Sequence, residues 1–199
     1  FHINLFFIIC FISHIYSVFF LDFVHENIKK VSLTKLTFIF TVYFVIIFLN
    51  RRIDVMINEY IADVCDLLDM DVPTISFDNT HFPTNTTMAL CDPVAHTIYL
   101  RKVDKPNPDY VFSIAHELRH IYQYETDEQY YLSDYKAADK CSSIEKYNLQ
   151  IAEIDANAFA AIVMKDFFAL APQWQGLTEN VITAINKQIK HLLNTEFYL

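Results

Sequence analysis

The chain has 199 residues and carries 15 lysine and arginine residues against 24 aspartate and glutamate residues, which gives a formal net charge of −9. This acidic balance argues against a general nucleic-acid-binding protein, because such proteins need a basic surface that displaces counterions from phosphates. The chain contains a single glycine, which excludes the glycine-rich phosphate loops of nucleotide-binding folds.

The composition of the chain changes near residue 55. Residues 1–55 hold 11 of the 18 phenylalanines and no alanine, glycine or proline. Residues 3–24 begin with a charge-free run long enough to cross a bilayer, and residues 36–49 form a second, shorter apolar run. Two hypotheses explain this hydrophobic segment: a membrane hairpin, or a non-native translation of an upstream region in a protein that starts at Met56. The first predicts a membrane-anchored protein and the second a cytoplasmic one.

The first element after this segment is an amphipathic helix over residues 54–70, in which apolar residues recur at helical spacing: Ile57, Ile61, Val64 and Leu68. Residues 74–77 are typical of a short strand. Residues 88–91 and 96–100 are two further strand-like runs around an Asp-Pro pair, and they predict a hairpin.

The second half of the chain is predicted to be mainly helical. A helix over residues 109–124 has a continuous apolar stripe, and residues 125–140 form a polar, tyrosine-rich loop or short helical pieces. A capping box of serine and glutamate opens a long helix over residues 143–168, and a last amphipathic helix covers residues 178–197. The sum is an α+β fold with a small antiparallel sheet and about four main helices.

The helix over residues 109–124 contains an HExxH motif, His116-Glu117-Leu118-Arg119-His120. Residues four apart lie one above the other on a helix, so both imidazoles can bind one ion at about 2.0–2.1 Å. Glu117 lies about 100° around the helix from His116 and can activate a zinc-bound water without being a ligand. The motif predicts His116 and His120 as zinc ligands and Glu117 as the catalytic residue.

A catalytic zinc ion needs a third protein ligand and an open position. The helix over residues 143–168 supplies Glu153, which shares a face with Ala156, Asn157 and Ala160, and the small residues would let the two helices approach closely. Asp155 is the competing ligand, but it lies about 200° around the helix from Glu153, so both cannot bind one ion. We favour Glu153, because Asn157 could accept a hydrogen bond from a ligand histidine and fix its tautomer.

Two longer motifs occur in this order: Phe112-Ser113-Ile114-Ala115-His116-Glu117-Leu118-Arg119-His120, and Glu153-x-Asp155-Ala156-Asn157-x-Phe159-Ala160. In both, the chain resembles the ImmA/IrrE-type HExxH zinc metallopeptidases over about residues 56–170. The resemblance implies that residues 56–199 form a zincin-like metallopeptidase domain, with the HExxH motif on a central helix and a protein such as a transcriptional repressor as the substrate. The chain departs from the family at Arg119, where a small residue is usual, and no helix-turn-helix is apparent.

These features predict a zinc-dependent metallopeptidase in which Glu117 takes a proton from water as it attacks a peptide carbonyl. The alternative is a non-catalytic metal-binding or interaction module, with a regulatory role, on the same fold. The expected partner is a protein or peptide substrate and not a nucleic acid, with a membrane involved only if residues 1–55 are genuine. An edge strand near residues 96–100 could align the peptide. Candidate donors to the developing oxyanion are Tyr122, Tyr124, Tyr130, Tyr131, Tyr135, Tyr147, His96 and Arg119.

Overall fold

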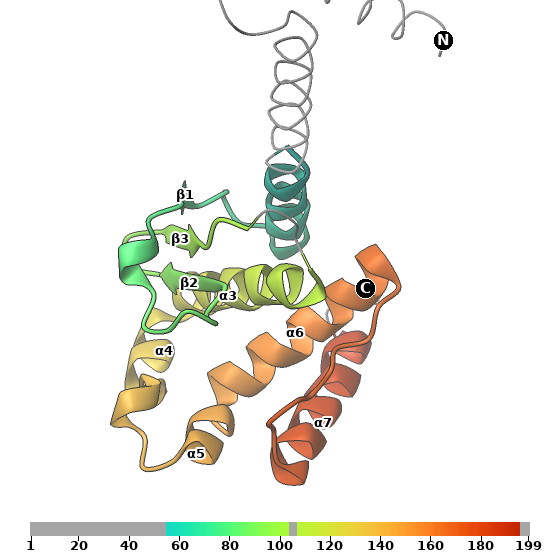
Figure 1. Ribbon diagram of the computed structural model, residues 1–199. Helices are drawn as coiled ribbons and strands as arrows, with labels where there is room; N and C mark the ends of the chain where they lie inside the picture. Colours follow the sequence, from blue (N-terminus) through green and yellow to red (C-terminus); the bar gives the residue numbers. More distant parts are fainter. Residues whose placement is uncertain (1–54, 104–106, 196–199) are drawn as a thin grey trace, which may run out of the picture. The chain divides into compact units, whose positions relative to one another are not determined.

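The computed structural model describes residues 55–103 and 107–195 (Figure 1). The described residues all belong to one compact unit of the chain. The hypotheses of a membrane hairpin and of an upstream translation concern residues 1–55, and all of these except Val55 lie outside the described residues. Within the two described stretches, no helix is both long and apolar enough to cross a membrane.

The helix predicted at the start of this unit is present over residues 55–68. The four residues of its apolar stripe are between 0 and 6% exposed. The helix is followed by Asp69, whose φ of 51° is left-handed, and it ends well before Pro73. The hydroxyl of Tyr60 donates to the backbone carbonyl of Val111 at 3.0 Å, which ties this first helix to the helix of the HExxH motif.

The three predicted strands form one sheet in the order β1 (Thr74–Ser76), β3 (Thr97–Leu100), β2 (Ala89–Asp92). The predicted hairpin is confirmed, because β2 pairs antiparallel with β3. The prediction of a wholly antiparallel sheet is wrong, because β1 pairs parallel with β3. The chain reverses direction between β1 and β2 and again between β2 and β3. β3 therefore runs in the same direction as β1, and it lies beside β1 in the sheet.

The position of β3 also corrects the predicted edge strand. β3 lies between β1 and β2, so both of its edges are hydrogen-bonded within the sheet and cannot accept a peptide. β2 stands at the end of the sheet order instead. The sequence pattern identifies a strand but does not specify which strands lie beside it.

Within the described residues there are six α-helices, four long ones as predicted and two short ones. The helix of the HExxH motif begins with Pro108 at its first turn, and the Asn107 side chain caps it by accepting from the Tyr110 amide at 2.8 Å. After the helix over residues 55–68 come α3 (Pro108–Thr126), α4 (Glu128–Asp134), α5 (Ile144–Asn148), α6 (Ile151–Phe168) and α7 (Glu179–Thr195), with short 3₁₀ turns at Asn79–His81 and Ala138–Lys140.

The prediction of one long helix over residues 143–168 is wrong, because the helix is interrupted between α5 and α6. Gln150 has an extended backbone, with a ψ of 145°, and its side chain accepts from the amide of Lys136 at 2.6 Å and donates to the Lys136 carbonyl at 2.9 Å. These bonds to a distant loop favour the break. The predicted cap also shifts by one residue, since Ser143 caps α5.

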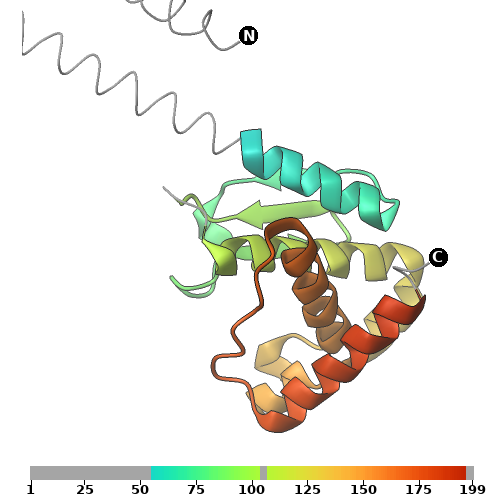
Figure 2. The ribbon, with the colours of Figure 1, turned by 90° about the vertical axis from the view of Figure 1, so that its right-hand side faces the viewer.

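The long helix α3 lies at the centre of the described unit. β2 packs against one side of α3, α6 packs against another, and α7 covers α6 (Figure 1; Figure 2). The predicted apolar stripe of α3 is buried, with Ile114, Ala115, Leu118 and Ile121 all 0% exposed. Burial of this stripe fixes the rotation of α3 about its axis, and this rotation turns the two histidines of the motif toward α6.

Candidate metal centre

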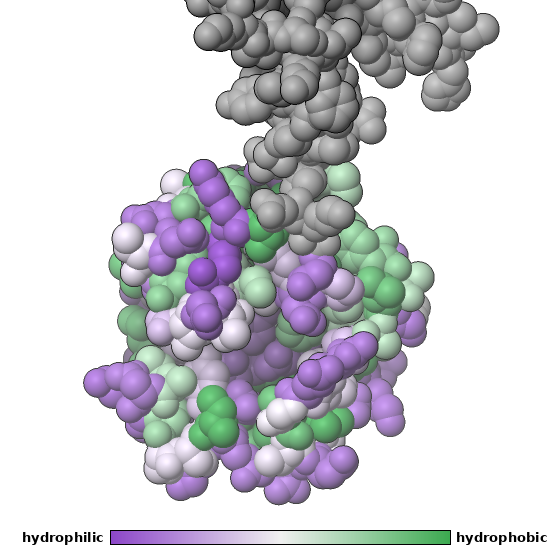
Figure 3. All heavy atoms as spheres, in the orientation of Figure 1, coloured by the Kyte–Doolittle hydropathy of each residue, from purple (hydrophilic) through white to green (hydrophobic). Residues whose placement is uncertain are grey.

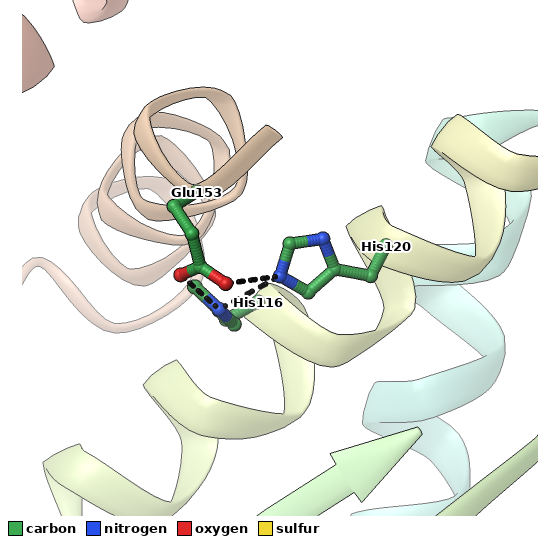
Figure 4. Close-up of side chains that lie close together, drawn as sticks. All are labelled: His116, His120 and Glu153. Carbon is green, nitrogen blue, oxygen red and sulfur yellow. Dashed lines mark hydrogen bonds and ion pairs between the residues drawn. The ribbon is translucent and has the colours of Figure 1, made fainter. Parts of the chain in front are cut away.

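The structure brings His116, His120 and Glu153 together. The two histidines lie one turn apart on α3, and Glu153 lies in the first turn of α6 (Figure 4). The Nε2 atoms of the histidines are 3.1 Å apart. The Glu153 carboxylate places Oε2 at 3.4 Å from Nε2 of His116, and Oε1 at 3.3 Å from Nε2 of His120. His120 and Glu153 are each 2% exposed.

These three side chains fit a zinc ion. Ligand atoms at about 2.0–2.1 Å from a tetrahedral ion stand about 3.3–3.4 Å from one another, close to the three observed separations. In addition, Oε1 of Glu153 is buried, and although Nε2 of His120 lies 3.3 Å away, no described residue makes a hydrogen bond of good geometry to it. Burying a carboxylate oxygen without a partner costs free energy, and a cation bound at this position would remove that cost. Two imidazoles and one carboxylate are a common ligand set of catalytic zinc.

The electrostatics of the cluster favour positive charge at the same point. Burial alone would raise the pKa of Glu153, but hydrogen bonds and the charges of His116 and His120 hold that pKa well below its usual range. Burial alone would lower the pKa of His120, yet the Glu153 carboxylate outweighs it and raises that pKa to about 9. The buried Glu153 carboxylate is therefore stabilised by positive charge at the point where the two imidazole nitrogens meet it.

Gln123 fixes the tautomer of His120. The amide nitrogen of Gln123 donates to the carbonyl of Ala152 at 3.0 Å and to Oδ2 of Asp155 at 2.8 Å, and both partners are acceptors only. The amide oxygen of Gln123 must therefore face Nδ1 of His120, 2.9 Å away. Nδ1 then carries a proton, and Nε2, which faces the cluster, is the atom that would offer its lone pair to a metal ion once the ion displaces its proton.

The role predicted for Asn157 falls to Gln123. The side-chain nitrogen of Asn157 donates to the backbone carbonyl of Glu153 at 2.8 Å, one turn back along α6. The Asn157 side chain therefore lies beside the backbone of Glu153 on α6. Gln123 instead follows His120 by three residues on α3 and contacts its ring. This role of Gln123 was not predicted from the sequence, although residues three apart on one helix, such as His120 and Gln123, are neighbours on its surface.

Asp155, the competing ligand, lies away from the histidines. Oδ2 of Asp155 accepts from Nε of Arg119 at 2.7 Å, and Oδ1 accepts from the amide of Gln188 at 2.8 Å. Burial would raise the pKa of Asp155, but its bonds to Arg119 outweigh burial and lower that pKa. The geometry therefore favours Glu153 over Asp155 as the third ligand. Asp155 instead forms an ion pair with Arg119.

Glu117 lies outside the cluster, at the wall of a cavity of about 210 Å³ that His120 also lines. Figure 3 shows one face of the described unit, which is hollowed near its centre and has hydrophilic residues at the floor of the hollow. Cys91 of β2 lines the same cavity. Burial, the charge of Glu117 and a hydrogen bond to Glu117 raise the pKa of the Cys91 thiol well above its ordinary value, so the thiol stays protonated.

Four of the eight candidate oxyanion donors line this cavity: Tyr124, Tyr131, Tyr135 and Tyr147. The other four are placed differently. Arg119 is engaged with Asp155 and stacks on Tyr122 at 4.7 Å, and Nδ1 of His96 bonds Glu125 at 2.6 Å. Tyr130 is 50% exposed and does not line the cavity.

Comparison of the chain with protein-family models, with curated proteins and with solved structures finds no match. What the site can do chemically therefore follows from its own residues. Three side chains from two helices can hold one divalent cation, and a carboxylate that is not part of the cluster faces the cavity beside it. This arrangement suits metal-assisted hydrolysis, in which one carboxylate binds the ion and another moves a proton.

The hydrogen bond from Gln123 predicts a measurable effect on metal affinity. Replacing Gln123 with methionine keeps the side-chain length but removes the acceptor for His120, and we expect zinc affinity to fall by roughly 10–100-fold. Competition with a chromophoric chelator measures the affinity. Gln175→Met, in an exposed loop, is the matched control and should bind as the unchanged protein does. Equal affinity of a folded Gln123→Met variant would show that Gln123 does not position His120.

Proposed function

We propose that the protein is a zinc-dependent metallopeptidase that hydrolyses a peptide bond of a protein or peptide substrate. One observation carries the proposal: two imidazole nitrogens of the HExxH motif and a carboxylate from a second helix converge at 3.1–3.4 Å, while Glu117 faces the adjoining cavity. His116, His120 and Glu153 would hold the ion. The resemblance of the two motifs to ImmA/IrrE-type peptidases supports the same assignment of roles.

Zinc held there would supply a Lewis acid that polarises the peptide carbonyl and acidifies water. Glu117 would take the proton of the attacking water and later donate it to the leaving amine. Gln123 would hold the ring of His120 through its Nδ1 proton.

Tyr131 is our choice for the donor to the developing oxyanion. Of the four tyrosines in the cavity, Tyr124 donates to Glu128 at 2.8 Å, and the hydroxyls of Tyr135 and Tyr147 lie 3.2 Å apart. The described residues show no hydrogen-bond partner for the Tyr131 hydroxyl. Burial raises the pKa of Tyr131, so its hydroxyl keeps its proton and can donate to the oxygen that gains charge.

The fold that we propose is zincin-like, with the HExxH helix packed under a small sheet whose end strand borders the cavity. Leu90 and Cys91 of β2 line the cavity that Glu117 also faces. A substrate that adds to the edge of β2 as a further strand would therefore pass Glu117. In this arrangement β2 takes the role that the sequence analysis gave to residues 96–100.

Replacement of Glu117 by glutamine tests the proposal. The variant should retain one zinc ion per chain, because Glu117 is not in the cluster, but should lose about 10²–10⁴-fold in hydrolysis of fluorescently labelled casein, because the amide cannot accept the proton. Zinc is measured by elemental analysis and hydrolysis by the rate of fluorescence release.

Glu59→Gln is the matched control, since Glu59 is an exposed glutamate on the helix over residues 55–68. This variant should cleave casein at the unchanged rate. Equal activity of Glu117→Gln and Glu59→Gln would remove Glu117 from the mechanism. Bound zinc without any hydrolysis in the unchanged protein would favour the alternative, a non-catalytic metal-binding or interaction module.

A further inference from the structure

The cavity beside Glu117 and His120 has the size of one side chain. Its volume is about 210 Å³, which is below the roughly 300–1,000 Å³ of sites that hold a whole small-molecule ligand. An apolar cavity of about 150 Å³ is known to bind benzene. A cavity of this volume therefore suits a phenyl ring or a leucine side chain and is small for a cofactor.

The walls of the cavity are mainly apolar and aromatic. Leu90 and Pro93 line it from β2 and the following turn, and the rings of Tyr131 and Tyr135 stack on each other with centroids 5.0 Å apart. Both rings also contact the ring of His120, at 6.0 and 5.4 Å. Aromatic walls in tilted and edge-on arrangements offer a further ring the contacts that such groups prefer.

The polar groups of the cavity are largely occupied by one another. The hydroxyls of Tyr135 and Tyr147 lie 3.2 Å apart, and Tyr124 donates to Glu128. Glu117 also lines the cavity, and its carboxylate would repel an acidic ligand. Apart from the Tyr131 hydroxyl, few groups remain to pair with a polar side chain, so burying one there would cost free energy that an apolar side chain does not lose.

The mouth of the cavity carries two exposed aliphatic residues on different elements. Val94, in the turn between β2 and β3, is 72% exposed, and Leu132 of α4 is 58% exposed. Single exposed apolar residues are common, but two that line one cavity together favour an apolar ligand.

We propose that this cavity binds one large apolar side chain of the substrate, of the size of leucine or phenylalanine, on the residue next to the bond that is cleaved. The adjacency to the cleaved bond rests on the proposed function, because Glu117 lines the same cavity. Binding of the side chain itself requires neither the metal nor catalysis. The two statements can therefore fail separately.

The test uses the full chain without added metal and two probes, N-acetyl-phenylalaninamide and N-acetyl-alaninamide, with binding followed by NMR titration. The phenylalanine probe should bind roughly 10–100-fold more tightly than the alanine probe, as expected for burial of a large apolar side chain. The double variant Val94→Lys/Leu132→Lys should lose this preference, because both changes place charges at the mouth.

The matched control is Val72→Lys/Leu67→Lys, which changes the same residue types and the same charge at positions that are 50% and 45% exposed and do not line the cavity. It should keep the preference for the phenylalanine probe. Equal binding of both probes to the unchanged protein, or an unchanged preference in the Val94→Lys/Leu132→Lys variant, would overturn the proposal.

A second readout separates this inference from the proposed function. In a casein digest analysed by mass spectrometry, cleavage sites should be enriched in leucine and phenylalanine next to the cut, and the cavity variant should lose that enrichment. Cleavage without enrichment would contradict the proposed role of the cavity but not the proposed peptidase activity. Selective probe binding without any cleavage or zinc would contradict the peptidase activity but not the binding of an apolar side chain in the cavity.

Discussion

Replacing Glu153 with glutamine is expected to reduce zinc from one ion per chain to far below that. Glu153 supplies the carboxylate of the cluster, with its oxygens 3.3 and 3.4 Å from the two imidazole nitrogens. A neutral amide of the same shape cannot balance the charge of a buried cation, and the loss should exceed the roughly 10–100-fold effect of removing an outer partner such as Gln123. Elemental analysis after purification without chelators, followed by competition titration, measures both stoichiometry and affinity.

Asp155→Asn is the matched control for this variant. It makes the same chemical change two residues away, at the acid that competed with Glu153 in the sequence analysis. Its oxygens face Arg119, Gln123 and Gln188, so the ion should stay bound although the fold is weakened. Retention of zinc by Glu153→Gln together with its loss in Asp155→Asn would reverse the assignment of the third ligand.

The helix that carries the motif could be predicted because its signals are local. The apolar stripe that includes Ile114, Leu118 and Ile121 repeats at helical spacing, and all three residues are 0% exposed in the structure. The proximity of His116 and His120 follows from helix geometry alone once α3 exists. The hairpin of β2 and β3 is local in the same sense, since a short turn joins strands that must then run antiparallel.

The approach of Glu153 to the histidines was only partly predictable. The face that Glu153 shares with Ala156 and Ala160 indicates a helix that can pack closely, and both alanines are 0% exposed. The position of Glu153 along α3, however, depends on how α6 crosses α3, and no local pattern specifies that crossing.

The break before α6 was not predictable from local pattern. Leu149 and Gln150 are neither proline nor glycine, and the serine and glutamate of the capping box favour a continuous helix from α5 onward. The break accompanies hydrogen bonds between Gln150 and Lys136, 14 residues away. Such bonds compete with helical ones only after the loop has folded, so helix propensity alone gives the wrong result.

The network around Asp155 gives Arg119 a structural role. On the sequence, Arg119 is an unexpected charge on a buried helix, and Asp155 is a rival ligand. In the structure the two form an ion pair across α3 and α6, and Asp155 also accepts from the amide of Gln123, which orients His120. The pair therefore connects the packing of the two helices to the geometry of the candidate metal site.

Replacing Arg119 with methionine is expected to destabilise the metal-free protein by about 3–5 kcal/mol, because it leaves a buried carboxylate without its cation. Arg119 is 3% exposed and the side chain of Asp155 is 14% exposed, so water cannot compensate. Urea-induced unfolding measures the free energy. Zinc affinity should also fall. Without Arg119, the Asp155 carboxylate is no longer held where it accepts from the Gln123 amide, and that amide orients His120.

The double variant Arg119→Met/Asp155→Asn separates the ion pair from simple loss of packing. With no charge left unpaired, it should recover part of the stability lost in Arg119→Met alone, and the asparagine oxygen can still accept from Gln123 or Gln188. If the double variant is as unstable as the single one, the contacts of the Arg119 side chain with Phe159 and Tyr122 stabilise the helix pair, and the charge of Arg119 does not.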